Sequence, residues 1–330
     1  MTANERLMDE AIALARVLDR LAQHSYQIAA GKLARLREDL SVLVIRYDPT
    51  SLRYAENQRT RLAALIQEAE RTISQTYVEI AARVDQDLLD AERLAQDSLS
   101  VLVAGLLVVK GLSRRMDDEV LANVRDQTLI TGASARDWIA KQSGDLQFRT
   151  GSALSEAMAV RRLTRIPVLN DLLDAIRSNT PGSLFSAPPR HIESLIVSAH
   201  HAVANSVRYE TIVRHPELFR AIQHLSVLDS KVTDICRSRA NLLFHLDGTG
   251  IGHRLRLIVP PIHYRCRSHI VPVMHPYDDL SPRIQRRVKR ADYTGAAVRE
   301  PDLADWLGKR SLERDEPPTD YSGARRVLGL

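Results

Sequence analysis

Two cysteines and a histidine form the most specific chemical pattern in this 330-residue sequence. His263 and Cys266 are three residues apart, so a single turn can present an imidazole nitrogen and a thiolate to one point. Cys236, the other of the two cysteines, can supply a third ligand. These residue types bind zinc, and tetrahedral zinc needs a fourth ligand. The candidates for that ligand are His269, His253 and Asp234.

The same three residues allow two other interpretations. The cysteines can form a disulfide, although so few cysteines in a chain of this length are typical of a reducing compartment. They can also be two buried thiols beside a histidine that hydrogen-bonds a backbone carbonyl. From the sequence alone, metal binding, disulfide formation and simple burial all stay open.

Other patterns give little support for catalysis. The sequence has no HExxH motif, no GxSxG motif and no phosphate-binding P-loop. A nuclease built on Asp229, Asp234 and His263 would need a third nearby carboxylate, and the surrounding residues are basic instead. The glycines of residues 247–252 lack the spacing of a dinucleotide-binding motif and predict a turn. We therefore expect a protein that is not an enzyme.

Positive charge is concentrated in one segment. The formal net charge of the chain is +5, and residues 235–275 hold six arginines against one acidic residue. Such arginines can neutralise DNA phosphates, with an affinity that depends on salt and not on base sequence. Alternatively, they form a solvated rim or pair with acidic residues of a partner. The candidates are Arg237, Arg239, Arg254, Arg256, Arg265 and Arg267.

A second basic run lies at residues 283–290. It is interpreted first as a solvated helix face, and second as a peptide that docks on DNA or on an acidic partner. The adjacent histidines His200 and His201 are expected to be one core residue and one surface residue. Neither feature predicts a catalytic site.

Composition excludes several classes of protein. Hydrophobic residues make up 44% and charged residues 26% of the chain, so neither wholesale disorder nor a multi-span membrane protein fits. The longest apolar run, residues 98–109, has about half the length of a membrane-spanning helix and predicts a fully buried core segment. Residues 1–19 carry charges where a secretory signal needs an apolar core, so we expect no such signal.

The N-terminal part predicts two long helices. Pro49 is the only proline before Pro167, which leaves room for two long uninterrupted helices. Apolar residues recur with a period of about 3.5 on both sides of Pro49, as in helices that pack along a seam. We expect residues 1–96 to form an antiparallel hairpin whose first arm needs a partner along this seam. The first-arm seam comprises Leu7, Ala11, Leu14, Leu18, Leu21, Ser25, Ile28, Leu33, Leu36, Leu40 and Leu43.

Three further parts are expected to follow the hairpin. Residues 97–185 predict shorter helices, and residues 186–275 predict a small α+β module. Residues 276–330, rich in proline, arginine and aspartate, predict an extended or weakly structured tail. The expected fold class is mainly α with a small α+β C-terminal module. Within that module and tail we expect a helix over 190–214, strands at 227–229, 254–260 and 268–274, and a short helix near 303–307.

The order of rare residues across the cysteine pattern resembles a known module. Asp-Ser-Lys-Val-Thr-x-x-Cys at 229–236 precedes Pro-Pro-x-His-x-x-Cys-Arg-Ser at 260–268 and a Val-Pro-Val strand. This arrangement is similar to the C-terminal module of the phage Mu F-like minor head proteins, the phage head morphogenesis family. Lys231 stands where that family usually has arginine, and Ser268 where a further cysteine is frequent. The matching positions are Asp229, Thr233, Cys236, Pro260, Pro261, His263, Cys266 and Arg267.

The resemblance covers residues 190–275, including a preceding helix with Asn205, Arg208 and Glu210. It implies a structural minor capsid protein of a tailed-phage virion, located in the head interior after assembly in the host cytoplasm. The implied partners are the portal protein or major capsid protein and packaged double-stranded DNA, with no membrane. The implied roles are head assembly and DNA packaging or ejection. The alternative is a stand-alone, sequence-independent nucleic-acid-binding protein, with or without a stabilising zinc.

Overall fold

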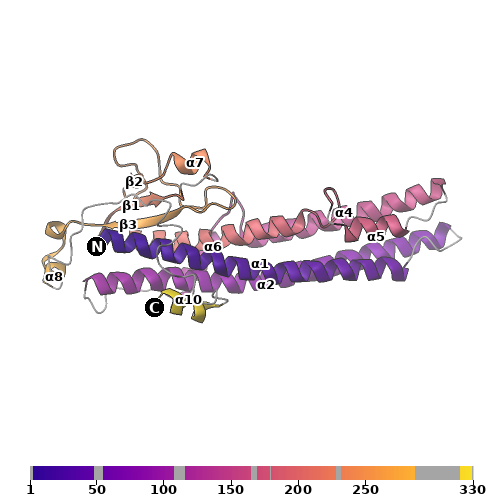
Figure 1. The fold of residues 1–330 in the computed structure, drawn as a ribbon, viewed down its shortest axis with the longest axis horizontal. Coiled ribbons are helices and arrows are strands. Elements are labelled where there is room, and N and C mark those ends of the chain that lie inside the picture. The colour runs from indigo at the N-terminus through magenta and orange to yellow at the C-terminus, as the bar shows by residue number, and fades with distance from the viewer. Residues whose placement is uncertain are drawn as a thin grey trace. The chain divides into compact units, whose positions relative to one another are not determined.

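The computed structural model describes residues 3–47, 55–107, 116–164, 169–178, 180–227, 232–286, 320–328 and 330. It is mainly helical, with one small antiparallel sheet in its C-terminal region, so the predicted fold class is confirmed (Figure 1). The longer helices are α1 (Ala3–Tyr47), α2 (Ala55–Leu107), α3 (Asp118–Gln127), α4 (Ala135–Thr164), α5 (Leu169–Arg177) and α6 (Pro188–Val213). The remaining elements are β1 (Phe219–Leu225), α7 (Asp234–Arg237), β2 (Leu243–Phe244), β3 (His269–Met274), η1 (Tyr277–Asp279), α8 (Pro282–Gln285) and α10 (Tyr321–Leu328).

The first two helices follow the apolar period of the sequence. The residues of the first-arm seam are buried in α1, except for Ile28, which is half-buried. Ile73, Ile80, Val84 and Leu88 are buried in α2. Because the chain's own side chains cover Leu14 and Leu18, the expected need for a separate partner along this seam is wrong. The turn predicted around Pro49 lies outside the described residues. No helix in the described ranges is both long enough and apolar enough to cross a bilayer.

The chain forms two compact units, each assembled from separated stretches of sequence. One unit comprises residues 1–23, 86–134 and 197–330, and the other comprises 24–85 and 135–196. Helices α1, α2 and α6 each contribute to both units. The division into residues 1–96, 97–185, 186–275 and 276–330 therefore stays a prediction.

The second unit is a set of packed helices. Lys32 of α1 forms an ion pair with Glu79 of α2, and Arg136 of α4 lies 2.6 Å from Asp85 of α2. These pairs show which helices are neighbours, but exposed ion pairs contribute little to stability. Its stability comes mainly from the buried apolar stripes, since each fully buried Leu or Ile side chain contributes about 1.5–3 kcal/mol.

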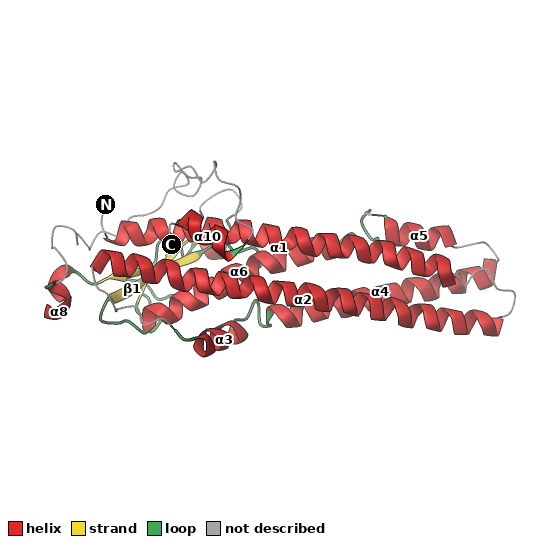
Figure 2. Cartoon of the chain, turned by 90° about the horizontal axis from the view of Figure 1, so that it is seen from below, coloured by secondary structure: helices red, strands yellow, loops and turns green. Residues whose placement is uncertain are grey.

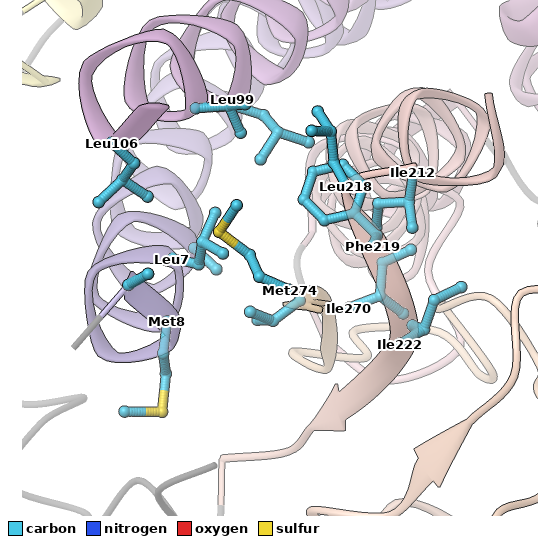
Figure 3. Packing of buried hydrophobic residues seen from close by; sticks show 14 of the residues in the cluster. Leu7, Met8, Leu99, Leu106, Ile212, Leu218, Phe219, Ile222, Ile270 and Met274 are labelled. Carbon is cyan, nitrogen blue, oxygen red and sulfur yellow. The ribbon is translucent and has the colours of Figure 1, made fainter. Parts of the chain in front are cut away.

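The first unit places its apolar core between helices and the sheet. In the sheet, β1 is central and pairs antiparallel with β2 on one side and β3 on the other. Figure 2 shows these strands among the helices of this unit. Figure 3 shows the side chains that meet in the core. They include Leu7, Met8, Leu99, Leu106, Ile212, Phe219, Ile222, Ile270 and Met274.

Three side chains hydrogen-bond the outer edge of β3. Asn205 accepts from the backbone N–H of Ile270 at 3.1 Å and donates to the Ser268 carbonyl at 3.2 Å. Arg208 donates from Nε to the Ile270 carbonyl at 3.2 Å. Asn4 of α1 accepts from the N–H of Met274 at 3.0 Å. These bonds satisfy backbone groups that an additional strand would otherwise pair, and they dock α6 and α1 on the sheet.

Several predicted strands are placed differently. The prediction at 268–274 is confirmed by β3, but residues 254–260 form no strand. A strand over 227–229 is also wrong at Val227, which follows the end of β1, while residues 228–229 lie outside the described part. The sequence interpretation missed β1 because six of its seven residues are buried, leaving no alternation of apolar and polar residues.

Three burial predictions need correction. His200 and His201 are both fully buried, so neither is a surface residue. Val101, in the apolar run, is 44% exposed, so that run is only partly buried where it is described. In the predicted tail, Leu280 and Ile284 belong to the core, and Tyr321 of α10 donates to Asp97 of α2 at 2.5 Å. The helix predicted near 303–307 and residues 287–290 lie outside the described part.

Candidate metal centre

Cys236, His263 and Cys266 meet in one place. Cys236 lies on the short helix α7, and the other two residues lie in the loop that leads into β3. The Cys236 Sγ atom is 3.1 Å from His263 Nε2 and 3.7 Å from Cys266 Sγ. The three ligand atoms all lie within 4.8 Å of one another, and both cysteines are buried. The structure therefore brings together the three residues that the spacing predicted as ligands.

The His263 ring is oriented by its other nitrogen. His263 Nδ1 lies 2.8 Å from the Tyr264 carbonyl, an acceptor that requires the proton to be on Nδ1. In the neutral ring this leaves the Nε2 lone pair facing the thiols. Thr233, which precedes α7, donates its hydroxyl to Nε2 at 2.9 Å instead of capping the helix. An imidazole held through its distal nitrogen is the usual arrangement in metal sites.

The loop that carries His263 and Cys266 is closed locally and anchored to α6. The Cys266 N–H donates to the His263 carbonyl at 3.1 Å, which closes the turn. Arg265 has a positive φ of 58°, and its backbone N–H donates to Ser198 Oγ of α6 at 2.8 Å. The preceding Pro260–Pro261 peptide bond is cis. The closed turn and the contact with Ser198 position both ligands without the help of a strand.

The two thiols share one negative charge. Cys266 donates to Cys236, and this bond is the largest of the effects that lower the pKa of Cys236 to about 4. A hydrogen bond from Ser268 also lowers it. The pKa of Cys266 is raised, because its hydrogen bond to Cys236 and its burial both favour the neutral thiol. A thiolate beside a thiol and an imidazole nitrogen is a donor set for a soft divalent cation.

None of the three predicted fourth ligands joins this cluster. Asp234 is fully exposed and lies 3.6 Å from Arg237. His253 has its Nε2 atom 2.9 Å from the Leu243 carbonyl. Its ring packs so tightly against Gly250 that a Cβ there would lie 2.4 Å from Nδ1. Among the described residues, the cluster therefore has three ligands.

The remaining candidate, His269, belongs to a separate group of buried imidazoles. Its ring packs edge-on against His201, with centroids 4.9 Å apart. Burial and the nearby positive groups hold the pKa of His269 well below its usual value. Asp229, the carboxylate considered for nuclease chemistry, lies outside the described residues.

A small pocket opens beside the cluster. Its volume of about 20 Å³ is enough for one water-sized atom. Cys236 and His263 form one side of it, and Thr233, Ser268, Arg265 and Arg267 line the rest together with Val227 and Val232. Two of the three predicted ligands, Cys236 and His263, thus line a space bordered by hydroxyl and guanidinium groups.

The six predicted arginines differ in exposure. Arg237, Arg254, Arg256 and Arg265 are exposed, whereas Arg239 and Arg267 are half-buried. Arg239 donates to the Ile235 carbonyl of α7 at 3.3 Å, which gives it a structural contact. Four of the six side chains are therefore accessible to solvent, and two are partly enclosed by the module.

Sequence reasoning did not assign roles to the hydroxyl groups around the centre. Ser226 donates to the Cys236 carbonyl at 3.0 Å and lies 3.1 Å from the Ser268 hydroxyl. Ser198 binds the Arg265 N–H from a helix more than sixty residues away in sequence. Thr233 is part of the motif, and its position three residues before Cys236 is the one signal that could have indicated its role.

The chain was compared with known families, curated proteins and solved structures. No protein-family model, no curated protein and no solved structure matches the chain.

Proposed function

We propose that this chain is a structural minor head protein of a tailed phage. In this role it lies in the head interior against the portal protein or the major capsid protein and acts in head assembly and in DNA packaging or ejection. The observation that carries the proposal is the meeting of Cys236 with His263 and Cys266, the rarest residues of the phage-head motif, across 26 intervening residues. Thr233, another motif position, touches the same centre.

A bound zinc ion fits the centre as a structural element. The residues that would hold it are Cys236, His263 and Cys266, whose atom types are those zinc prefers. Zinc would cross-link α7 to the loop before β3, and this supplies folding free energy rather than chemistry.

Genetic complementation tests the head function. In the phage or prophage that encodes the chain, we expect its deletion to give defective heads or heads without DNA. The full chain should restore normal heads, and a Cys236→Ser/Cys266→Ser chain should not. Asp234→Asn, on the same helix but fully exposed, is the matched control and should restore them. Normal heads in the deletion strain would refute the proposal.

Metal analysis tests the zinc assignment separately. The full chain purified without chelator should contain one zinc per chain, and chelation should lower its melting temperature. Cys266→Ser should lose the metal, whereas Asp234→Asn should keep it. Zinc well below one per chain, with unchanged melting of Cys266→Ser, would exclude a structural zinc and leave the head proposal standing.

A second candidate function is sequence-independent nucleic-acid binding. The observation that favours it is the exposure of Arg237, Arg254, Arg256 and Arg265 in a segment with little acidic charge. Binding to random duplex DNA should weaken steeply with salt, and Arg254→Gln/Arg256→Gln should reduce the slope of log K against log salt by about 2. Arg35→Gln/Arg59→Gln, with the same change in charge on exposed helix positions, is the control. Salt-independent or undetectable binding would exclude this candidate.

A further inference from the structure

We propose that the fourth position of the Cys236–His263–Cys266 centre takes an exchangeable oxygen ligand, which is water or an oxygen of a small oxyanion such as phosphate. This inference rests on the proposed metal binding and goes beyond it, because a purely structural zinc has four protein ligands. Three observations support the inference: the number of protein ligands, the space beside the centre and the charges around it.

The number of protein ligands is the first argument. In the described part of the chain only three ligating atoms lie within 4.8 Å of one another. The residues that the sequence offered as a fourth are turned to other contacts, as shown above for His253 and Asp234. Zinc with three protein ligands completes its tetrahedron with a water or another exchangeable ligand.

The space beside the centre is the second argument. The pocket lined by Cys236 and His263 has a volume of about 20 Å³, which is enough for one oxygen atom. Hydroxyl groups of Thr233 and Ser268 line it, and these can donate to a bound oxygen. Arg265, which also lines the pocket, is exposed, so solvent reaches this wall.

Charge balance is the third argument and selects the class of ligand. Two thiolates and a neutral imidazole carry two negative charges, which cancel the charge of a divalent cation, so the bound centre would be neutral. A neutral centre does not repel an anion. Arg265 and Arg267 border the same pocket, and guanidinium groups bind the oxygens of phosphate and carboxylate through charge-assisted hydrogen bonds. The surroundings therefore favour an oxyanion over a neutral ligand.

Cobalt substitution of the full chain tests the proposal. Tetrahedral Co²⁺ bound by thiolates has visible absorption bands that change when one ligand is exchanged. We expect these bands to shift on titration with inorganic phosphate at constant ionic strength, with saturation. Acetate in a parallel titration distinguishes carboxylate from phosphate recognition.

The variants assign the effect to the pocket. Arg265→Gln/Arg267→Gln should bind cobalt normally and weaken the apparent phosphate affinity about tenfold. Arg237→Gln/Arg254→Gln removes the same charge from exposed positions that do not line the pocket, and should behave as wild type.

Bands that respond to neither anion, with a spectrum unchanged by Asp229→Ala, would overturn the oxyanion assignment and leave water as the exchangeable ligand. Bands that respond to neither anion, together with a spectrum altered by Asp229→Ala, would show a protein fourth ligand and overturn the inference while leaving the metal site intact. Equal responses in both double variants would overturn the role of the two arginines. Failure of the chain to bind cobalt or zinc would overturn this inference and the zinc assignment together.

Discussion

The guanidinium group of Arg208 on α6 lies 2.7 Å from the Glu10 carboxylate on α1. The Arg208 side chain is fully buried, and that of Glu10 is 11% exposed. The same guanidinium donates to the Ile270 carbonyl at the edge of β3. One side chain therefore joins the first helix, the helix before the module and the outer strand of the sheet, all within one compact unit.

Removing Arg208 should strongly destabilise this unit. In Arg208→Leu the Glu10 carboxylate stays in a largely buried position without its partner, and the Ile270 carbonyl loses a hydrogen bond. Breaking a buried pair in this way costs about 3–5 kcal/mol. Urea denaturation followed by far-ultraviolet circular dichroism measures the change in midpoint.

The control for this prediction is an exposed pair at the C-terminal end of α6, where Arg214 directly follows the helix. Arg214 lies 3.5 Å from Glu210, and both side chains are partly exposed to solvent. Arg214→Leu should therefore change stability by less than about 1 kcal/mol. Equal effects of the two substitutions would contradict the structural role of Arg208.

The two asparagines at the edge of β3 give a reciprocal prediction. Asn205 accepts from the Ile270 N–H, and Asn4 accepts from the Met274 N–H. Asn205→Ala should speed amide hydrogen exchange at Ile270 about fivefold, because a hydrogen bond of about 1 kcal/mol is lost there. Asn4→Ala should do so at Met274. The measurement is residue-resolved hydrogen exchange by NMR, and each variant is the control for the other.

A uniform increase in exchange along β3 in both variants would mean that the asparagines act through global stability. In that case the asparagine side chains would not act by hydrogen-bonding the exposed backbone edge of β3. We expect instead that each variant speeds exchange at its own amide only, Asn205→Ala at Ile270 and Asn4→Ala at Met274. This result would distinguish a local hydrogen bond from an effect on global stability.

The buried imidazole of His269 predicts a loss of stability in acid. Its pKa is lowered by burial first and by positive neighbours second, so the folded state holds it neutral. The groups that face it are His201, Arg208 and His224, and Asp19 and Glu10 are paired with the first two. The unfolded state binds the proton below a pH of about 6.5, so the free energy of unfolding falls as pH decreases from there.

The variant His269→Phe tests this assignment. It keeps a buried ring and removes the titrating group, so its stability should fall less steeply than that of the wild type between neutral pH and the acid transition. Urea midpoints measured across this range give the comparison. His245→Phe, at a position that is not fully buried, should leave the slope as in the wild type. Parallel curves for wild type and His269→Phe would contradict the prediction.

The sequence predicts the helical body and the meeting of Cys236, His263 and Cys266. It fails where a segment is buried on more than one side. Leu14 and Leu18 belong to a single buried face of α1. The period of the apolar residues can therefore be recognised in the sequence. His200 and His201 are both buried because α6 contacts neighbours on more than one side; His201 Nε2, for example, lies 2.7 Å from Asp19 of α1. Periodicity cannot separate such positions.

The strand errors have a related cause. Residues 254–260 alternate arginine with leucine, which favours extended backbone, but a strand also needs a hydrogen-bonding partner. In the structure Leu257 N–H donates to the Gly248 carbonyl of a turn, and no strand is formed. Contacts of this kind, like that of Ser198 with Arg265, join residues that are far apart in sequence and leave no local pattern.

Replacing Ser268 with cysteine should complete the metal centre. Ser268 is buried, lines the pocket beside Cys236 and His263, and hydrogen-bonds Cys236. A thiolate at this position would add a fourth protein ligand to the set, and three cysteines with one histidine form a closed zinc site.

We expect Ser268→Cys to bind zinc at least tenfold more tightly in competition with a chromophoric chelator, and to lose the response of its cobalt spectrum to phosphate. Ser238→Cys, on the exposed surface after α7, adds the same thiol outside the pocket and should change neither property. If Ser268→Cys binds zinc no more tightly than the wild type, then Ser268 does not face the fourth position, and the geometry argued for the open site is wrong.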